Sequence, residues 1–175
     1  MCTLAAAALA VSAVGTGVSA YGQMQAGKAQ QSQLNYQAAV DRNNKIIADR
    51  YANDAIERGK EAEAEQRRKT QQIIANQRVG FAANGIDLGS DVVTETLSDS
   101  AMLGELDALT IRSNAAREAY GYKVQGMNYE ASAQNNVLAG KNARSAGRTA
   151  AMSTLLSGTA SVGNSYVDYK SKGIL

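Results

Sequence analysis

Two groups of basic side chains are the residues of this sequence with the clearest chemical use. The first is Arg67, Arg68 and Lys69, and the second is Lys141, Arg144 and Arg148. Each group fits two interpretations. It can be a solvated helix face, which is the ordinary situation, or it can line a path for DNA through loose phosphate contacts. The formal net charge of +2 does not by itself indicate a strong polyanion partner.

Catalytic constellations are hard to assemble from this composition. The sequence has no histidine and one cysteine, Cys2, so the usual nucleophile–base pairs and an internal disulfide are excluded. Glu105 and Asp107 are two residues apart on a predicted helix and therefore point to different sides. Asp87 and Asp91 offer too few oxygen ligands for a calcium site. We expect no enzymatic activity, no cofactor and no metal.

Composition predicts an all-α fold. The 175 residues contain no proline and are rich in alanine, glutamine and charged helix formers, which favours long unbroken helices. Aromatic residues make up only 5%, so a large globular core is difficult to build. Sixteen glycines stand against helix formation, because each costs about 1 kcal/mol relative to alanine inside a helix. We infer that some of these glycines allow close approach of two backbones.

A glycine-rich corner is predicted at residues 80–99. Asn84-Gly85 and the neighbouring glycines tolerate positive φ and stop helices, while Ser90 and Asp91 are suitable N-caps. We expect a short helix at 92–97 and apolar side chains that plug the corner, although a mobile linker between unrelated helices is the alternative. The corner residues are Gly80, Phe81, Gly85, Ile86, Leu88 and Gly89.

Two helical arms of similar length flank this corner, at residues 28–79 and 100–148. In the first arm Tyr36, Val40, Ile47 and Tyr51 recur at helical spacing on one face. Arms of matching length predict an antiparallel αα-hairpin. One hairpin buries little, so we expect several copies to assemble side by side into a ring or tube.

Both ends of the chain carry uncharged segments, at residues 1–27 and 149–167, followed by a short polar tail at 168–175. The first segment fits a secretory signal, though it lacks basic residues near its start, or a transmembrane helix of weak composition. We favour a third interpretation, a conditional membrane tip that inserts as an oligomer through small-residue helix contacts. The tip residues are Leu4, Leu9, Val11, Val14, Val18, Leu155, Leu156 and Val162.

A family resemblance is carried by the segment at 104–122, which reads Gly-Glu-Leu-Asp-Ala-Leu-Thr-Ile-Arg-Ser-Asn-Ala-Ala-Arg-Glu-Ala-Tyr-Gly-Tyr, and by the corner at 80–90. With their flanking alanine- and glutamine-rich arms, they resemble the small internal virion proteins of tailed bacteriophages, mainly short-tailed ones. The resemblance covers roughly residues 30–150. It implies storage inside the capsid, ejection ahead of the genome, and an oligomeric channel in the outer membrane of a Gram-negative host. It assigns no role to individual residues.

The resulting hypothesis is a phage ejection protein that forms a conduit for DNA across the host outer membrane. Its implied partners are copies of itself, other ejection, portal or tail proteins, the host outer membrane, and DNA in transient contact. The implied locations are the virion interior and then the host envelope. Two alternatives remain: a purely structural virion or tail-lumen component, and a secreted helical translocator or adhesin.

Overall fold

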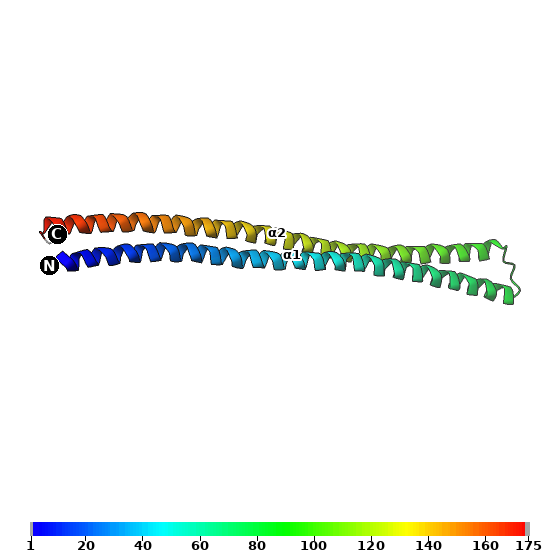
Figure 1. Ribbon diagram of the computed structural model, residues 1–175. Helices are drawn as coiled ribbons and strands as arrows, with labels where there is room; N and C mark the ends of the chain where they lie inside the picture. The colour runs from blue at the N-terminus through cyan, green and yellow to red at the C-terminus, as the bar shows by residue number, and fades with distance from the viewer. Residues whose placement is uncertain (1, 174–175) are drawn as a thin grey trace. The chain divides into compact units, whose positions relative to one another are not determined.

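The computed structural model describes the backbone of residues 2–173 and the side chains of residues 10–173. Two α-helices, α1 (Cys2–Ala83) and α2 (Asp91–Ser171), pack against each other as a hairpin (Figure 1). The described residues contain no strand. The predicted all-α hairpin is therefore confirmed.

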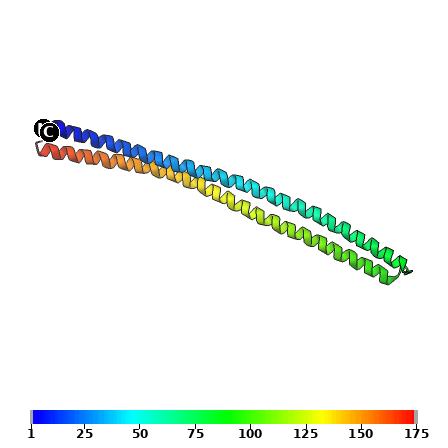
Figure 2. The same ribbon diagram turned by 90° about the horizontal axis from the view of Figure 1, so that it is seen from below.

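The hairpin divides into two compact units, and each takes one segment from each helix. We call them the end unit (Met1–Arg42 with Glu130–Leu175) and the corner unit (Asn43–Tyr129). In the end unit the beginning of α1 and the end of α2 lie side by side, as both Figure 1 and Figure 2 show. The two uncharged segments of the sequence thus meet in the same unit.

Helix α1 ends in a glycine cap in the corner unit. Gly85 has a φ of 72°, the Gly85 N–H donates to the Ala82 carbonyl (3.1 Å), and the Ile86 N–H donates to the Phe81 carbonyl (3.0 Å). These two bonds form a Schellman motif, which satisfies carbonyls at the helix end. Because this cap is centred on Gly85, the helix passes through Gly80 and stops at Ala83.

Helix α2 begins at Asp91 and continues without a break past Ser100. The Gly89 N–H donates to Asp87 Oδ1 (3.0 Å), and the Ser90 hydroxyl donates to the Asp87 carbonyl (2.8 Å), so Asp87 organises the turn before the helix. The separate short helix expected at 92–97 is instead the first part of α2. No proline follows that would end it.

Small side chains form the contact surface between the helices, which we call the seam. In the corner unit the buried apolar residues are mainly alanines, and Ala52, Ala55 and Ala119 form one cluster. In the end unit Ala20, Ala38, Ala133 and Ala151 are buried. Among the large apolar side chains that the structure describes, only Val93 is almost fully enclosed. The helices can therefore approach closely, but they bury little apolar surface.

Glycines occupy the tightest positions of the seam. A Cβ at Gly59 would strike Ala115, one at Gly104 would strike Thr70, and one at Gly158 would strike Thr16. Gly140 packs against Gln31 and Leu34 in the same way, at ordinary contact distance. At Gly59, Gly104 and Gly158 the missing Cβ makes room for a side chain of the other helix. The expected close approach of two backbones is found at Gly27 and Gly147, where the nearest atoms belong to the opposite backbone.

Candidate functional site

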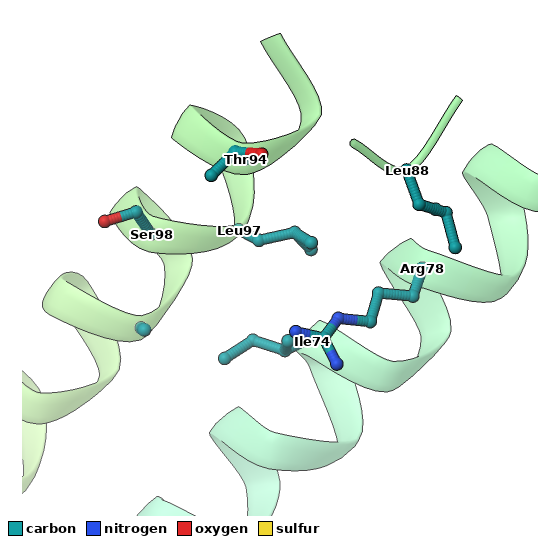
Figure 3. A pocket seen from close by; sticks show the side chains of 7 residues that line it. Ile74, Arg78, Leu88, Thr94, Leu97 and Ser98 are labelled. Carbon is teal, nitrogen blue, oxygen red and sulfur yellow. The ribbon is translucent and has the colours of Figure 1, made fainter. Parts of the chain in front are cut away.

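The corner contains a hollow between the two helices. It is lined by Ile74 and Arg78 of α1, Leu88 of the loop, and Thr94, Leu97, Ser98 and Ala101 of α2. Figure 3 shows the side chains of Leu97, Leu88 and Ile74 directed toward this space. Phe81 is half-buried, whereas Ile86 and Leu88 remain substantially exposed. The expected apolar plug is thus incomplete, because Ile86 and Leu88 cover the helix ends only partly.

Ion pairs cross the seam in the corner unit. The Arg58 guanidinium contacts Glu118 of α2 at 2.9 Å and Asp54 of its own helix at 2.9 Å. The hydrogen bond to Glu118 and the two carboxylate charges raise the pKa of Arg58 above its ordinary value. This arginine consequently keeps its charge at any practical pH.

Arg67 makes a second crossing point. Its guanidinium forms two hydrogen bonds with the Glu105 carboxylate of α2, at 2.7 and 3.0 Å, and contacts the buried Glu63 at 2.9 Å. The hydrogen bond to Arg67 lowers the pKa of Glu105, and the same bond raises the pKa of Arg67. Because Glu63 is buried in the seam, the contact with the Arg67 guanidinium offsets the cost of removing its carboxylate charge from water.

The first basic group is therefore largely neutralised by neighbouring carboxylates. Arg67 is engaged as described, and Lys69 contacts Glu65 at 2.8 Å, which lowers the pKa of Glu65. Arg68 is exposed and makes no ion pair with any residue that the structure describes. The suggestion that these three residues form a common DNA-facing surface receives no support from this arrangement.

The second basic group lies in the end unit and has different surroundings. Lys141, Arg144 and Arg148 are all exposed, and the Arg144 guanidinium reaches the side-chain oxygen of Gln31 at 3.5 Å. Residues 131–167 contain no acidic side chain, and residues 1–40 contain Lys28 as their single charge. The positive charge of this group is thus not balanced by nearby carboxylates in either segment.

Both uncharged segments contribute to the end unit. The hydroxyl of Thr154 donates to the side-chain oxygen of Gln23 (3.0 Å), and Thr16 packs against Gly158. Five of the predicted tip residues expose their side chains: Val11, Val14, Val18, Leu155 and Leu156. Val162 is half-buried, and the side chains of Leu4 and Leu9 lie outside the described residues.

Two hydroxyl groups of the first uncharged segment donate to carbonyls of their own helix. Thr16 donates to the Ser12 carbonyl at 2.8 Å, and Ser19 donates to the Gly15 carbonyl at 2.9 Å. Such bonds let small polar residues lie in apolar surroundings without an unpaired donor. Even so, over the part of the chain that the structure covers, no helical segment combines the length and hydropathy needed to cross a bilayer.

The acidic residues considered for chemistry have structural partners. Glu105 binds Arg67, and Asp107 accepts a hydrogen bond from the Gln66 side chain at 3.4 Å. Within the described residues, no three His, Cys, Asp or Glu side chains gather in a way that could hold a metal ion.

The polar contacts across the seam were not anticipated from the sequence, and those of Asp41 are an example. Asp41 accepts hydrogen bonds from Ser132 (2.7 Å) and Asn136 (3.0 Å) across the seam of the end unit. These partners are distant in sequence, so this contact could be identified only once the pairing register of the two helices was known.

Comparison with known families gives a match over almost the whole chain. A family model described as the T7 virus internal virion protein gp14 family matches residues 1–174. Searches of curated proteins and of solved structures gave no significant match.

Proposed function

Because the chain belongs to the T7 virus internal virion protein gp14 family, and so to the phage proteins held in the virion interior, we propose that it leaves the particle with the genome and forms a conduit across the host outer membrane. The proposed conduit is an oligomer of this chain, assembled side by side. Other ejection, portal or tail proteins and the host outer membrane are its proposed partners. The protein acts in this scheme without catalysis.

The observation that carries the proposal is the surface of the end unit. Val11, Val14 and Val18 of α1 and Leu155 and Leu156 of α2 expose large apolar side chains in segments that carry no charge. Uncharged segments with exposed apolar residues can enter the interfacial and apolar layers of a bilayer without desolvating an ionised group. The weak hydropathy of each single helix favours insertion as an assembly, in which helix–helix contacts supplement contact with lipid.

The seam supports the same reading. Close contacts between small residues, such as Thr16 with Gly158, give helix association that does not depend on water. A hairpin held together in this way can keep its pairing when its surroundings change from aqueous to apolar.

Lys141, Arg144 and Arg148 are the proposed site of transient contact with DNA. They are exposed and lack nearby carboxylates, in contrast to Arg67 and Lys69. Contacts with phosphates alone would be independent of base sequence, as passage of a whole genome requires.

The test is dye release from liposomes that contain lipids of a Gram-negative outer membrane. The purified full chain is expected to release the dye while discrete rings appear in electron micrographs. Leu155→Asp should reduce release severalfold, because it places a charge in the uncharged tip. The matched control is Leu103→Asp, which introduces the same charge at an exposed leucine of the corner unit.

Rings that leave the liposomes intact would contradict the membrane step and favour the alternative of a purely structural virion or tail-lumen component. Equal loss of release in both variants would also count against a specific role for the tip. The secreted translocator or adhesin alternative does not fit a family of internal virion proteins.

A further inference from the structure

The seam of the end unit fixes which residues of the two helices are level with each other. Thr16 meets Gly158, Gly27 meets Gly147, and Leu34 meets Gly140. Each step forward along α1 is matched by an equal step back along α2. By this register Val18 is level with Leu156, and Tyr36 is level with Leu138.

These four level residues point away from the seam. Each stands two positions before a seam residue: Val18 before Ala20, Tyr36 before Ala38, Leu138 before Gly140, and Leu156 before Gly158. Two positions correspond to about 200° around an α-helix, so their side chains project from the opposite side of each helix. Their exposed fractions are 67% for Val18, 72% for Tyr36, 56% for Leu138 and 66% for Leu156.

Each helix of the end unit thus carries a large apolar stripe on its outer side. Val18 and Tyr36 are five full turns apart, and so are Leu138 and Leu156, which places the members of each pair in the same direction. The α1 outer stripe consists of Val11, Val18, Tyr36 and Val40, and the α2 outer stripe of Leu138, Met152, Leu156 and Val167. The named members carry no charge. Lys141 and Arg148 lie along the same side of α2 between Leu138 and Met152, so a contact on this stripe must leave their charged ends in solvent.

The two stripes are also complementary in size. Gly22 lies one turn after Val18 on α1, and nothing lies near the position of its absent Cβ. The residue level with it on α2 is Met152, whose side chain is exposed. The exposed methionine of one stripe is therefore level with a glycine of the other stripe that leaves space where a side chain would be.

We propose that the occupant of each outer stripe is a second copy of this chain, with the α1 outer stripe of one copy packed against the α2 outer stripe of the next. The proposal rests on the self-assembly included in the proposed function and specifies its contact surface. Val11, Val18 and Leu156 then face the neighbouring copy, which leaves Val14 and Leu155 for contact with lipid. The level pairs Val18–Leu156 and Tyr36–Leu138 then meet between copies of the same orientation. Because the two stripes are different surfaces, the contact is head-to-tail and repeats from copy to copy, closing into a ring where the rotation allows.

At the outer positions, which stand two residues before a seam residue, the corner unit shows no such pair of large apolar residues. Ile47 and Met127 are level and exposed there, but each stands next to a seam residue. In the corner unit the seam pairs Thr70 with Gly104, so the exposed Leu106 is level with Arg68. By the same register, Leu109 is level with Glu65. The outer positions match in the end unit, at Val18–Leu156 within the uncharged segments and at Tyr36–Leu138 beyond them, and they differ in the corner unit, where α1 is densely charged.

Disulfide cross-linking of the full chain tests the proposal, with Cys2→Ser as the background. The double variant Val18→Cys/Leu156→Cys should form a ladder of dimers, trimers and larger species on mild oxidation, because each copy then offers one cysteine to each neighbour. Each single variant should stop at dimers of low yield. Tyr36→Cys/Leu138→Cys is a second level pair and should give the same ladder.

The matched control is Val18→Cys/Leu138→Cys. It uses the same two stripes, but its cysteines are about 27 Å out of level at 1.5 Å per residue. Disulfides require Cα atoms within about 7 Å, so its ladder should be at least tenfold weaker. Circular dichroism of every variant must show unchanged helix content.

Several outcomes would overturn the proposal. One is a ladder of equal strength from the level and off-level pairs, and another is the absence of a ladder from both level pairs. Cross-links within one chain would also overturn it. Efficient dimers from single variants would do so too, because they indicate a symmetric contact. If ladders are missing while rings and dye release persist, this contact surface is wrong and the conduit remains supported. If ladders form without dye release, the contact surface stands and the membrane step fails.

Discussion

Gly27 and Gly147 face each other across the seam of the end unit. A Cβ built on Gly147 would lie 3.0 Å from the Cα of Gly27 and 2.8 Å from the carbonyl oxygen of Gln23. Both of these neighbours are backbone atoms of α1, which cannot move aside as a flexible side chain could. The pair therefore sets how closely the two helices approach in this unit.

Gly147→Ala should destabilise the hairpin by about 1–3 kcal/mol, since the added methyl group must push the backbones apart. The control is Gly121→Ala, because nothing lies near the Cβ position of this helical glycine. That change should stabilise the protein by about 0.5–1 kcal/mol through helix propensity. Thermal unfolding followed by circular dichroism measures both effects, and stabilisation by Gly147→Ala would show that the close contact is absent.

Asp41 is expected to be the most sensitive polar residue of the end unit. Its carboxylate accepts bonds from Ser132 and Asn136, so Asp41→Ala should cost about 1–3 kcal/mol. A double-mutant cycle with Asn136→Ala should reveal coupling of at least about 0.5 kcal/mol. Strictly additive effects in urea unfolding would indicate that the bond across the seam contributes nothing.

Acid should weaken the corner unit. The pKa of Glu105 is lowered in the folded protein by its hydrogen bond to Arg67, so its stabilising contribution is complete above about pH 4.3, the ordinary glutamate value. This contribution is lost as the pH falls through the lower folded-state pKa. The melting temperature should therefore fall as the pH is lowered from 7 to 3. The Glu105→Gln variant should have a lower melting temperature than the unchanged protein at pH 7, and its melting temperature should fall less over the same pH range.

The expected size of this acid effect is modest, because both partners are substantially exposed to solvent. Glu57→Gln provides a control, since Glu57 pairs with Lys60 of its own helix and does not cross the seam. A pH profile of Glu105→Gln identical in slope to that of the unchanged protein would contradict the role given to the Arg67–Glu105 pair.

DNA binding should distinguish the two basic groups. Changing Lys141, Arg144 and Arg148 together to glutamine should weaken binding to DNA of any sequence. It should also reduce the slope of log affinity against log salt by up to about 3, near 0.9 for each lost phosphate contact on duplex DNA. The same change at Arg67, Arg68 and Lys69 should have a smaller effect on affinity, because Arg67 and Lys69 already bind carboxylates. Fluorescence anisotropy at several salt concentrations gives the salt slope of each triple variant. Equal slopes for the two variants would contradict the assignment of DNA contact to Lys141, Arg144 and Arg148.

The hairpin could be predicted from sequence because its signals are local. Gly85 is free to adopt positive φ, and the absence of proline lets both helices run on, so the turn and the two arms follow from backbone chemistry. The seam was harder to identify. The periodicity of Tyr36, Val40, Ile47 and Tyr51 marks a helix face that is largely exposed, although the ring of Tyr51 lies 5.5 Å from that of Tyr122 of α2, centroid to centroid. The buried contact face consists mainly of alanine and glycine.

Alanine is too abundant in this chain to mark a face by its own pattern. The large side chains dominate any hydrophobic periodicity, and in this protein many of them lie at the edge of the seam or on the outer side of the helices. Contacts such as Asp41 with Asn136 depend on the register of the pairing, which the Gly27–Gly147 approach fixes and local sequence does not show.

The alanine- and glycine-lined seam has a calorimetric consequence. Unfolding heat capacity rises with the apolar area that becomes exposed, and separating helices that meet through methyl groups and backbone exposes little of it. Alanine and glycine also give up almost no side-chain rotamer freedom when they pack. Separation and re-pairing of the two helices should therefore carry a small heat-capacity change, and the stability of the pairing should vary little with temperature.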